Sequence, residues 1–393
     1  MTKRILDTES PWLLVLLASL VAVGPLTIDM YLPALPGMVD DFSTTTSSVQ
    51  LTISSFLVGF AVFHLVCGPL ADRFGRKPIL IGGMGLFVIA SLACARADSI
   101  ENLILFRFLQ GVGACVGPTL ARAMARDIFG PRRAARALAY IAMIMALAPA
   151  IAPTLGGLLL QFFHWSSIFY VLAGYALLCI AFVTVKLPES LPEVQSLHPT
   201  EIGRNYLQLL RSGHYLRTTC ASSLLYSGMI AFLSGSSFIF IDMMGVSTAV
   251  FGVLFLPTVA GYIAGNAIST RLAHGRDPEQ VMWIGARLGL LGAVIMATAS
   301  EFYPGPLGIV LPMSLYSLAL GVVLPHAMAA ALRPFPHMAG TASALLGFIQ
   351  MGLSSLGGAL VGLLLVDSPR PMTLMIVTVC ACSCVLIRRL QAR

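Results

Sequence analysis

Long apolar stretches recur along this 393-residue chain from end to end, and they constrain its fold more than any other feature. A run of eighteen or more apolar residues is long enough to cross the hydrocarbon core of a bilayer as a helix. The chain is 57% hydrophobic and 10% charged, with a mean hydropathy of +0.88, far above that of a soluble globular protein. At about twenty residues per span, the length predicts an all-α membrane protein with roughly twelve transmembrane helices.

A polar connection near the middle divides the apolar stretches into two sets of six. The predicted spans lie near 11–36, 47–70, 78–95, 100–124, 136–163, 166–186, 215–242, 248–272, 280–300, 305–332, 338–366 and 372–387. We therefore expect a first bundle over 1–186, a linker over 187–211 and a second bundle over 212–393. The 203–210 part of the linker has the pattern of an amphipathic helix that lies on a membrane surface.

The two predicted bundles resemble each other weakly in sequence. Phe74-Gly75-Arg76 follows the second span, and His274-Gly275-Arg276 follows the eighth. Leu109-Gln110-Gly111-Val112 in the fourth span likewise resembles Ala319-Leu320-Gly321-Val322 in the tenth. The equivalent positions of these matches favour a six-plus-six duplication with pseudo-symmetric bundles.

Basic residues gather in alternate loops. The loops near 72–77, 122–136 and 271–276, the loop at Arg333 and the C-terminal tail are basic, whereas the intervening loops are acidic or nearly neutral. By the positive-inside rule, both termini should be cytoplasmic in a multi-pass protein of the cell (inner) membrane. The formal charge of +7 comes from these short loops and not from one folded face, so we expect no nucleic-acid partner.

The sequence offers no pattern for a metal, a nucleotide or a catalytic site. Most of the eight cysteines lie within apolar runs, where they resemble small packing residues. Phe74-Gly75-Arg76-Lys77-Pro78 has Pro where a phosphate-binding loop needs Ser or Thr to reach Mg²⁺. Clustered acid, base or ligand residues at one depth are likewise not apparent. We expect no enzyme activity and no cofactor, and an ion gradient as the energy source for any uphill transport.

Two ionisable residues stand out among those inside the predicted spans, Asp29 and Arg107. Such a side chain costs several kcal/mol in a bilayer unless it is paired or hydrated, so each is a candidate functional group. Asp29 lies about eight residues before the outer end of its span and Arg107 about eight after the outer start of its own, which places both roughly 12 Å below the outer surface. We expect Arg107 to contact Asp29 and tune its proton affinity. The alternative is a permanent structural salt bridge.

The charged segment from Gly68 to Lys77 lies between the second and third spans. The small Gly68 should allow tight packing, and Gly75 should permit a turn. Asp72 ends a helix where it can face the positive N-terminus of the eleventh span, and Arg76 is placed to pair with Asp127. These residues predict a cytoplasmic latch, whereas Arg73 is explained equally well by positive-inside topology.

This segment resembles the loop signature of the major facilitator superfamily. Four further segments resemble its twelve-helix drug/proton antiporters, in particular the Bcr/CflA group and the MdfA-type multidrug transporters: Asp29-Met30-Tyr31-Leu32-Pro33-Ala34-Leu35-Pro36, Arg107-Phe108-Leu109-Gln110-Gly111, Ala152-Pro153-Thr154-Leu155-Gly156-Gly157 and Gly340-Thr341-Ala342-Ser343-Ala344. The resemblance implies proton-coupled export of small drugs such as antibiotics, with a proton- and substrate-responsive carboxylate at Asp29. Ala152 departs from the Gly usual before the proline of the antiporter motif.

Further residues are candidates on weaker grounds. Pro153, Gly156 and Gly157 predict a kinked fifth span with a flat face for close helix packing. Secondary cavity candidates are Tyr31, Gln110, His64 and His326. We expect a monomer whose partners are protons, the lipid bilayer and a small drug or metabolite. The alternative function is a proton-coupled symporter for nutrient uptake, because the fold alone does not set the direction of transport.

Overall fold

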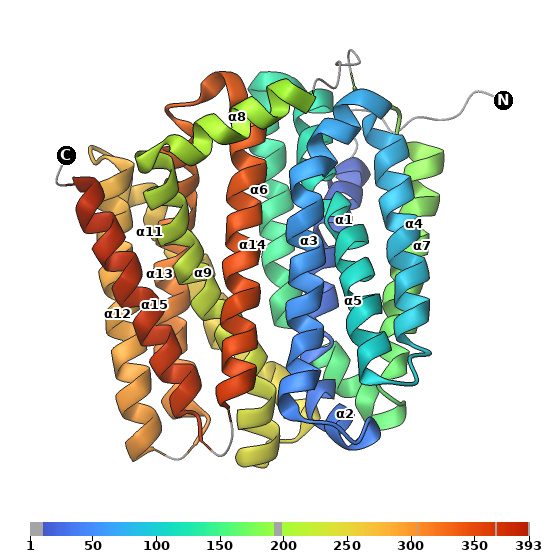
Figure 1. The fold of residues 1–393 in the computed structure, drawn as a ribbon, viewed down its shortest axis with the longest axis vertical. Coiled ribbons are helices and arrows are strands. Elements are labelled where there is room, and N and C mark those ends of the chain that lie inside the picture. The colour runs from blue at the N-terminus through green and yellow to red at the C-terminus, as the bar shows by residue number, and fades with distance from the viewer. Residues whose placement is uncertain (1–10, 192–198, 304, 366–367, 392–393) are drawn as a thin grey trace.

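The structure is a computed structural model that describes residues 11–191, 199–303, 305–365 and 368–391. Within these ranges the chain is built of helices and contains no strand. Most of the helices run along the long axis of the molecule, and both ends of the chain lie at the same end of it (Figure 1). We call this end the terminal face and the other end the opposite face. The predicted all-α fold is confirmed.

The helices form two groups that follow each other in the sequence. The first group consists of α1 (Pro11–Asp29), η1 (Leu32–Ala34), α2 (Leu35–Asp41), α3 (Thr46–Phe74), α4 (Arg76–Cys94), α5 (Ile100–Ala114), α6 (Val116–Phe162) and α7 (Ser166–Lys186). In it, α1 packs against α6, α3 against α5, and α4 against α5 and α7. The short helix α8 (Pro199–Arg211) follows and lies across the terminal face, as the amphipathic pattern predicts (Figure 1).

The second group consists of α9 (Gly213–Ser237), η2 (Phe238–Met243), α10 (Thr248–Phe251), η3 (Gly252–Phe255), α11 (Leu256–Leu272), α12 (Pro278–Phe302), α13 (Leu307–Leu332), η4 (Pro336–Met338), α14 (Ala339–Leu364) and α15 (Arg370–Gln391). Here α13 packs against α11 and α12, and α9 packs against α14 and α15. The two groups meet where α3 packs against α14 and where α6 packs against α10, η3 and α11.

Eleven stretches of the described chain are long and apolar enough to cross a membrane, and Leu147–Phe162 is a shorter apolar helix at the place of the predicted fifth span. The break expected between the fourth and fifth spans is present. It lies within α6, where the backbone departs from helical geometry at Gly130, with φ 66° and ψ 172°. Glycine adopts this positive φ without the steric cost that a Cβ adds.

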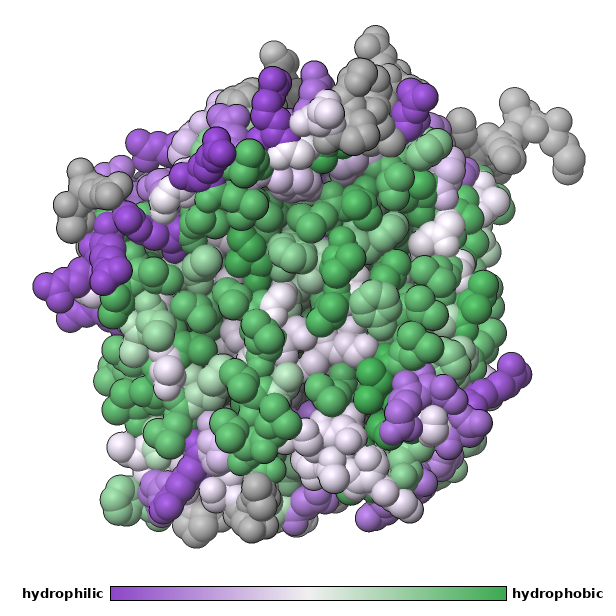
Figure 2. Space-filling view, in the orientation of Figure 1, coloured by the Kyte–Doolittle hydropathy of each residue, from purple (hydrophilic) through white to green (hydrophobic). Residues whose placement is uncertain are grey.

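Large apolar side chains cover the sides of the molecule. Figure 2 shows a broad hydrophobic band with hydrophilic residues gathered toward both ends. The exposed side chains include those of Ile89, Leu178, Phe182, Leu291 and Leu363. Such a surface is unfavourable in water but matches a bilayer, where the hydrocarbon core contacts the band and the charged ends reach the headgroups.

Candidate functional site

Asp29 lies where the first transmembrane segment loses its helical geometry. Helix α1 ends at Asp29, and the chain continues through a turn into η1 and α2, which contain Pro33 and Pro36. Proline lacks the N–H that would continue the helix and disfavours helical geometry in the residue before it. The side chain of Asp29 is 4% exposed, and it forms no ion pair within the part of the chain that the structure describes. A broken helix in a transporter places polar groups inside the protein.

Arg107, on α5, is fully buried among aromatic rings. The guanidinium carbon lies 4.6 Å from the ring centroid of Tyr31 and 4.7 Å from that of Phe56, which are cation–π distances. Its Nη1 donates a hydrogen bond of 2.6 Å to Gln110 Oε1, whereas Nε and Nη2 have no hydrogen-bond partner among the described residues. Aromatic faces therefore supply much of the compensation that a carboxylate would otherwise give.

The expected contact between Asp29 and Arg107 is wrong for this structure. No ion pair within 4.0 Å joins them in the described chain. The ring that meets the guanidinium belongs to Tyr31, two residues after Asp29. The expectation relied on equal depth in the bilayer, but depth does not fix the direction in which a side chain points around the helix axis.

Tyr31 and Gln110, expected to line a cavity, are fully buried and hydrogen-bonded. Tyr31 Oη lies 2.9 Å from Thr52 Oγ1 on α3, and Gln110 Nε2 donates to Ser91 Oγ on α4 at 2.8 Å. Their polar groups hold α1, α3, α4 and α5 together around Arg107. The prediction that they line a cavity is therefore corrected: in this structure they support the first helix group from within.

Asp29 faces the second helix group. Tyr226 on α9 lies within electrostatic range of Asp29 and of Tyr262 on α11. Both tyrosines are partly exposed, and the side chain of Tyr262 also interacts with Asn266. Sequence reasoning missed both tyrosines, because a phenol in an apolar span signals only that its hydroxyl needs a partner, and the partner lies on another helix. Tyr226 is thus within range both of the carboxylate of the first group and of a second phenol of its own group.

Gly156 and Gly157 hold α6 close to two different neighbours. Gly156 packs against the backbone carbonyl of Met30, next to Asp29, and Gly157 packs against the carbonyl of Thr248 on α10. A Cβ at either position would overlap that carbonyl. The flat helix face expected here is therefore present. The backbone dihedral angles stay helical through Pro153, and the break in α6 is at Gly130.

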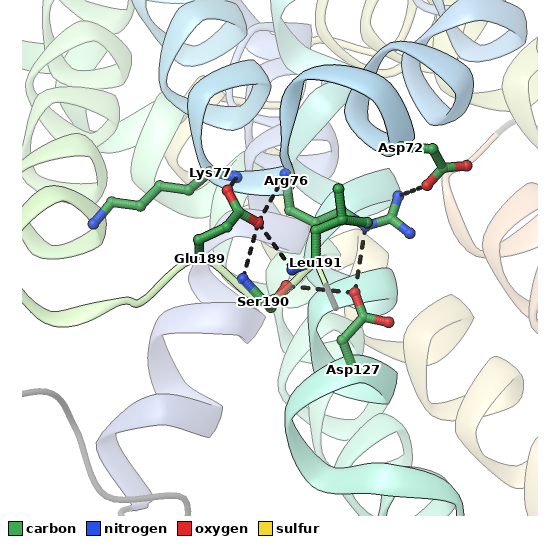
Figure 3. Close-up of polar contacts among 7 residues, drawn as sticks. All are labelled: Asp72, Arg76, Lys77, Asp127, Glu189, Ser190 and Leu191. Atoms are coloured by element: carbon green, nitrogen blue, oxygen red, sulfur yellow. Dashed lines mark hydrogen bonds and ion pairs between the residues drawn. The ribbon is translucent and has the colours of Figure 1, made fainter. Parts of the chain in front are cut away.

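The charged loop between α3 and α4 turns at Gly75, whose φ is +99°. Directly after it, the Arg76 guanidinium lies 2.7 Å from Asp72 and 3.3 Å from Asp127, so the pairing with Asp127 that the sequence suggested is present (Figure 3). The two carboxylates come from α3 and α6, and Arg76 begins α4. One guanidinium therefore ties three helices together at the terminal face.

Glu189 completes this cluster, and sequence reasoning missed it. Its carboxylate accepts the backbone N–H groups of Arg76 and Lys77, each at 3.0 Å (Figure 3). These are unpaired donors at the start of α4, where the helix dipole also favours an anion. Ser190 Oγ donates to Asp127 at 3.4 Å. The start of the linker is thus bound to the loop, in a contact that joins residues more than a hundred positions apart in sequence.

Two expectations for the same loop need correction. A Cβ on Gly68 would meet nothing within 4 Å, so this glycine is not required for tight packing here. The partner of Asp72 in the structure is Arg76 and not the start of α14. Arg73 is exposed, as positive-inside topology alone predicts.

The two candidate histidines occupy packed positions. His64 Nδ1 lies 3.5 Å from Cys115 Sγ, and its ring packs against Gly347 of α14. His326 Nδ1 lies 3.1 Å from Ser269 Oγ and 3.0 Å from the Val322 carbonyl, inside the second helix group. The described residues contain no group of three or more His, Cys, Asp or Glu side chains placed to hold a metal ion.

Comparisons with known proteins agree on one family. The model of the Major Facilitator Superfamily matches residues 17–359. A bicyclomycin resistance protein homolog of Haemophilus influenzae is 31% identical over 362 residues, which cover 91% of this chain and 90% of that protein. The multidrug resistance protein MdtL of Escherichia coli is 33% identical over 341 residues, covering 86% and 85%. The crystal structure of a D-xylose-proton symporter superposes with a TM-score of 0.75 at 14% identity, covering 95% of this chain and 97% of that one, which shows a common fold.

Proposed function

Since this chain belongs to the major facilitator superfamily and is therefore a multi-pass membrane transporter of small molecules and not an enzyme, we propose that it exports amphipathic drugs such as antibiotics in exchange for protons. The names of the two relatives, bicyclomycin resistance and multidrug resistance, support export of this cargo class. An interior with few charges also suits lipophilic neutral or weakly cationic molecules better than sugars, whose many hydroxyls need polar partners.

The observation that carries the proposal is the buried, unpaired carboxylate of Asp29. An ionised carboxylate without a cation is costly inside a protein, so the group is stable when it holds a proton or associates with a cationic or hydrogen-bonding cargo. Its position at a broken helix, facing Tyr226 of the second helix group, allows both. Proton and cargo then compete for one site, which is the requirement for exchange.

Arg107 acts in this scheme on the position of Asp29 and not by direct pairing. The guanidinium holds the ring of Tyr31, and Tyr31 belongs to the turn that follows Asp29. Gly156 holds the intervening Met30 from another side. The carboxylate is thereby kept at a fixed place while the second helix group moves past it.

We propose that residues 1–186 and 212–393 move as two bundles about Asp29, with 187–211 as the linker between them. The terminal face is then the cytoplasmic side of the inner membrane, consistent with its basic loops. The cluster of Asp72, Arg76 and Asp127 acts there as a latch that holds the ends of α3, α4 and α6 in one arrangement, so that this end of the first bundle moves as a unit during switching. Proton coupling, membrane and orientation are parts of this one proposal.

Drug susceptibility of cells that overexpress the wild type or Asp29→Asn tests the proposal. We expect the wild type to confer resistance and the variant to confer none, because asparagine cannot exchange a proton. Asp40→Asn is the matched control, since Asp40 is an exposed aspartate of the same segment. In parallel, adding a transported drug to the purified, weakly buffered protein should release protons from the wild type and Asp40→Asn but not from Asp29→Asn. Equal resistance from all three proteins would exclude the role of Asp29, and resistance from none would favour uptake.

A separate measurement tests the latch. Asp72→Asn should slow conformational cycling, followed as the rate of drug exchange in proteoliposomes, while drug binding at equilibrium stays nearly unchanged. The reason is that Asp72 holds Arg76 at the terminal face, away from Asp29. A selective loss of binding with normal cycling would contradict the latch but leave the role of Asp29 untouched.

A further inference from the structure

Helix α8 joins the two helix groups at the terminal face. Leu209 is fully buried in a cluster that includes Tyr215, Ala342 and Leu345 of the second group. Tyr206 Oη donates a hydrogen bond of 2.8 Å to the backbone carbonyl of Leu65 on α3, in the first group. Burial raises the pKa of Tyr206 to about 12, so the phenol keeps the proton that it donates. The inward side of α8 is thus fixed to the protein.

The sides of α8 that do not pack against the protein differ in the side chains that they carry. At 100° per residue, Leu207 and Leu210 fall beside the buried side, and Arg204 and Arg211 fall directly beyond them. Glu201, Asn205 and Gln208 follow on the next side around the helix, which adjoins Arg204. We call the first of these sides the leucine–arginine flank; it consists of Arg204, Leu207, Leu210 and Arg211.

All four residues of the leucine–arginine flank are exposed, and both leucines are 47% exposed. Apolar surface of this kind next to two cations is unfavourable in water, yet it fits the boundary of a bilayer, where leucines enter the acyl region and arginines reach the phosphates. The guanidinium is suited to this because it binds a phosphate through two parallel hydrogen bonds. Glu201 lies one turn before Arg204 and about 60° from it around the helix axis, so the two arginines and this one acid leave the exposed side of α8 with a net positive charge.

We propose that the leucine–arginine flank of α8 is a binding site for an anionic phospholipid. The two arginines hold its headgroup phosphate, and the two leucines contact its acyl chains. Because α8 is also bonded to α3 and packed into the second helix group, the bound lipid contacts the element that connects the two groups. This inference concerns the membrane surface and does not depend on which cargo is transported.

Native mass spectrometry of the purified full-length protein tests the site. The protein is titrated in a neutral detergent with phosphatidylglycerol, or with phosphatidylcholine as the uncharged reference. We expect Arg204→Gln/Arg211→Gln to weaken phosphatidylglycerol binding by about tenfold, because each basic residue near a lipid surface contributes a modest, additive attraction. The matched control is Arg271→Gln/Arg276→Gln, which removes two exposed charges from the last turn of α11 and the turn after it, outside α8, and should leave binding within about twofold.

A second variant tests the apolar half of the site. Leu207→Ser/Leu210→Ser should weaken both lipids, because it removes acyl-chain contact but no charge. Glycerol phosphate without acyl chains should bind weakly to all variants, which separates a lipid site from a phosphate site. Unchanged phosphatidylglycerol binding in the arginine variant, or an equal loss in the control, would overturn the proposal. Thermal melting of each variant should match the wild type, since all substituted side chains are exposed.

Discussion

The turn after α3 and the turn after α11 each contain a glycine with positive φ, but they differ in their network of charges. Gly75 and Gly275 both have positive φ, +99° and +73°, and each precedes an arginine. The side chain of Arg76 is only 15% exposed and lies between two carboxylates. Arg276, in contrast, is exposed. Both halves of the chain thus place a glycine with positive φ before an arginine, while only the first half has a charge cluster around that arginine.

The interiors of the two helix groups show the same difference. The first group buries Asp29 and Arg107. The second group buries His326 and many hydroxyls, while its Arg287 is exposed and lies 5.9 Å from the ring of Trp283. In the proposed cycle the second group therefore supplies a surface against which the first group moves, because the buried pair of an acid and a guanidinium, Asp29 and Arg107, lies in the first. Four paired substitutions test this asymmetry.

The largest effect is expected for Arg107→Lys compared with Arg287→Lys. Lysine keeps the charge but cannot stack flat on Tyr31 and Phe56 while bonding Gln110, so a buried charge is left poorly compensated. We expect Arg107→Lys to lower stability by roughly 3 kcal/mol and Arg287→Lys to have almost no effect. Thermal melting of the purified proteins in detergent measures both. Equal shifts would mean that the aromatic contacts around Arg107 are not energetically special.

Gly75→Ala and Gly275→Ala come next. At Gly75 a Cβ would lie 2.7 Å from the Glu189 carboxylate, and φ +99° with ψ 148° is a region that only glycine adopts readily. At Gly275 a Cβ would meet nothing within 4 Å. We expect a loss of about 2–3 kcal/mol at Gly75 and about 1 kcal/mol at Gly275, the cost of a positive φ alone. Combining Gly75→Ala with Glu189→Ala should recover part of the loss by relieving the clash.

Features that depend on composition and sequence order were predictable. Apolar length gave the number of spans, and the period of polar residues gave α8. The turn at Gly75 and the ion pair between Arg76 and Asp127 were also expected from the charged loop. Each of these follows from transfer free energies or from local backbone sterics, which a single sequence contains.

Features that depend on the rotation of one helix against another were not predictable. The sequence places Asp29 and Arg107 at one depth, but it does not show that Tyr31 would take the cation. Glu189 looked like an ordinary linker acid, because its role requires the end of α7 to lie beside the start of α4. Tyr226 becomes informative only once the two helix groups face each other.

Arg76→Gln compared with Arg276→Gln tests the two loops directly. Removing the guanidinium of Arg76 leaves Asp72 and Asp127, both partly buried, without their shared cation. We expect a loss of about 1–2 kcal/mol and drug export reduced by roughly tenfold, because repulsion between the carboxylates loosens α3 from α6. Arg276→Gln should behave as the wild type in both measurements. A variant that melts normally but fails to export would show that the cluster acts in switching more than in folding.

The smallest effect on stability is expected at the opposite face, where each half has a carboxylate that binds a side chain from a later part of the same half. Asp41 Oδ2 accepts from Trp165 Nε1 at 2.7 Å and from His164 Nε2 at 3.0 Å, whereas Glu301 pairs with Arg370 at an exposed site. Asp41→Ala leaves the donor of Trp165, a largely buried side chain, without a partner, so we expect a loss of about 1 kcal/mol. Glu301→Ala should not change the melting temperature at physiological salt, because exposed ion pairs are screened.

Melting curves at low and high salt separate the two: the Asp41 effect should persist, and any Glu301 effect should appear only at low salt. If Glu301→Ala lowered the melting temperature more than Asp41→Ala, an ion pair would contribute to holding the helices of the second half together. The asymmetry between the halves would then be confined to the interior and the terminal face.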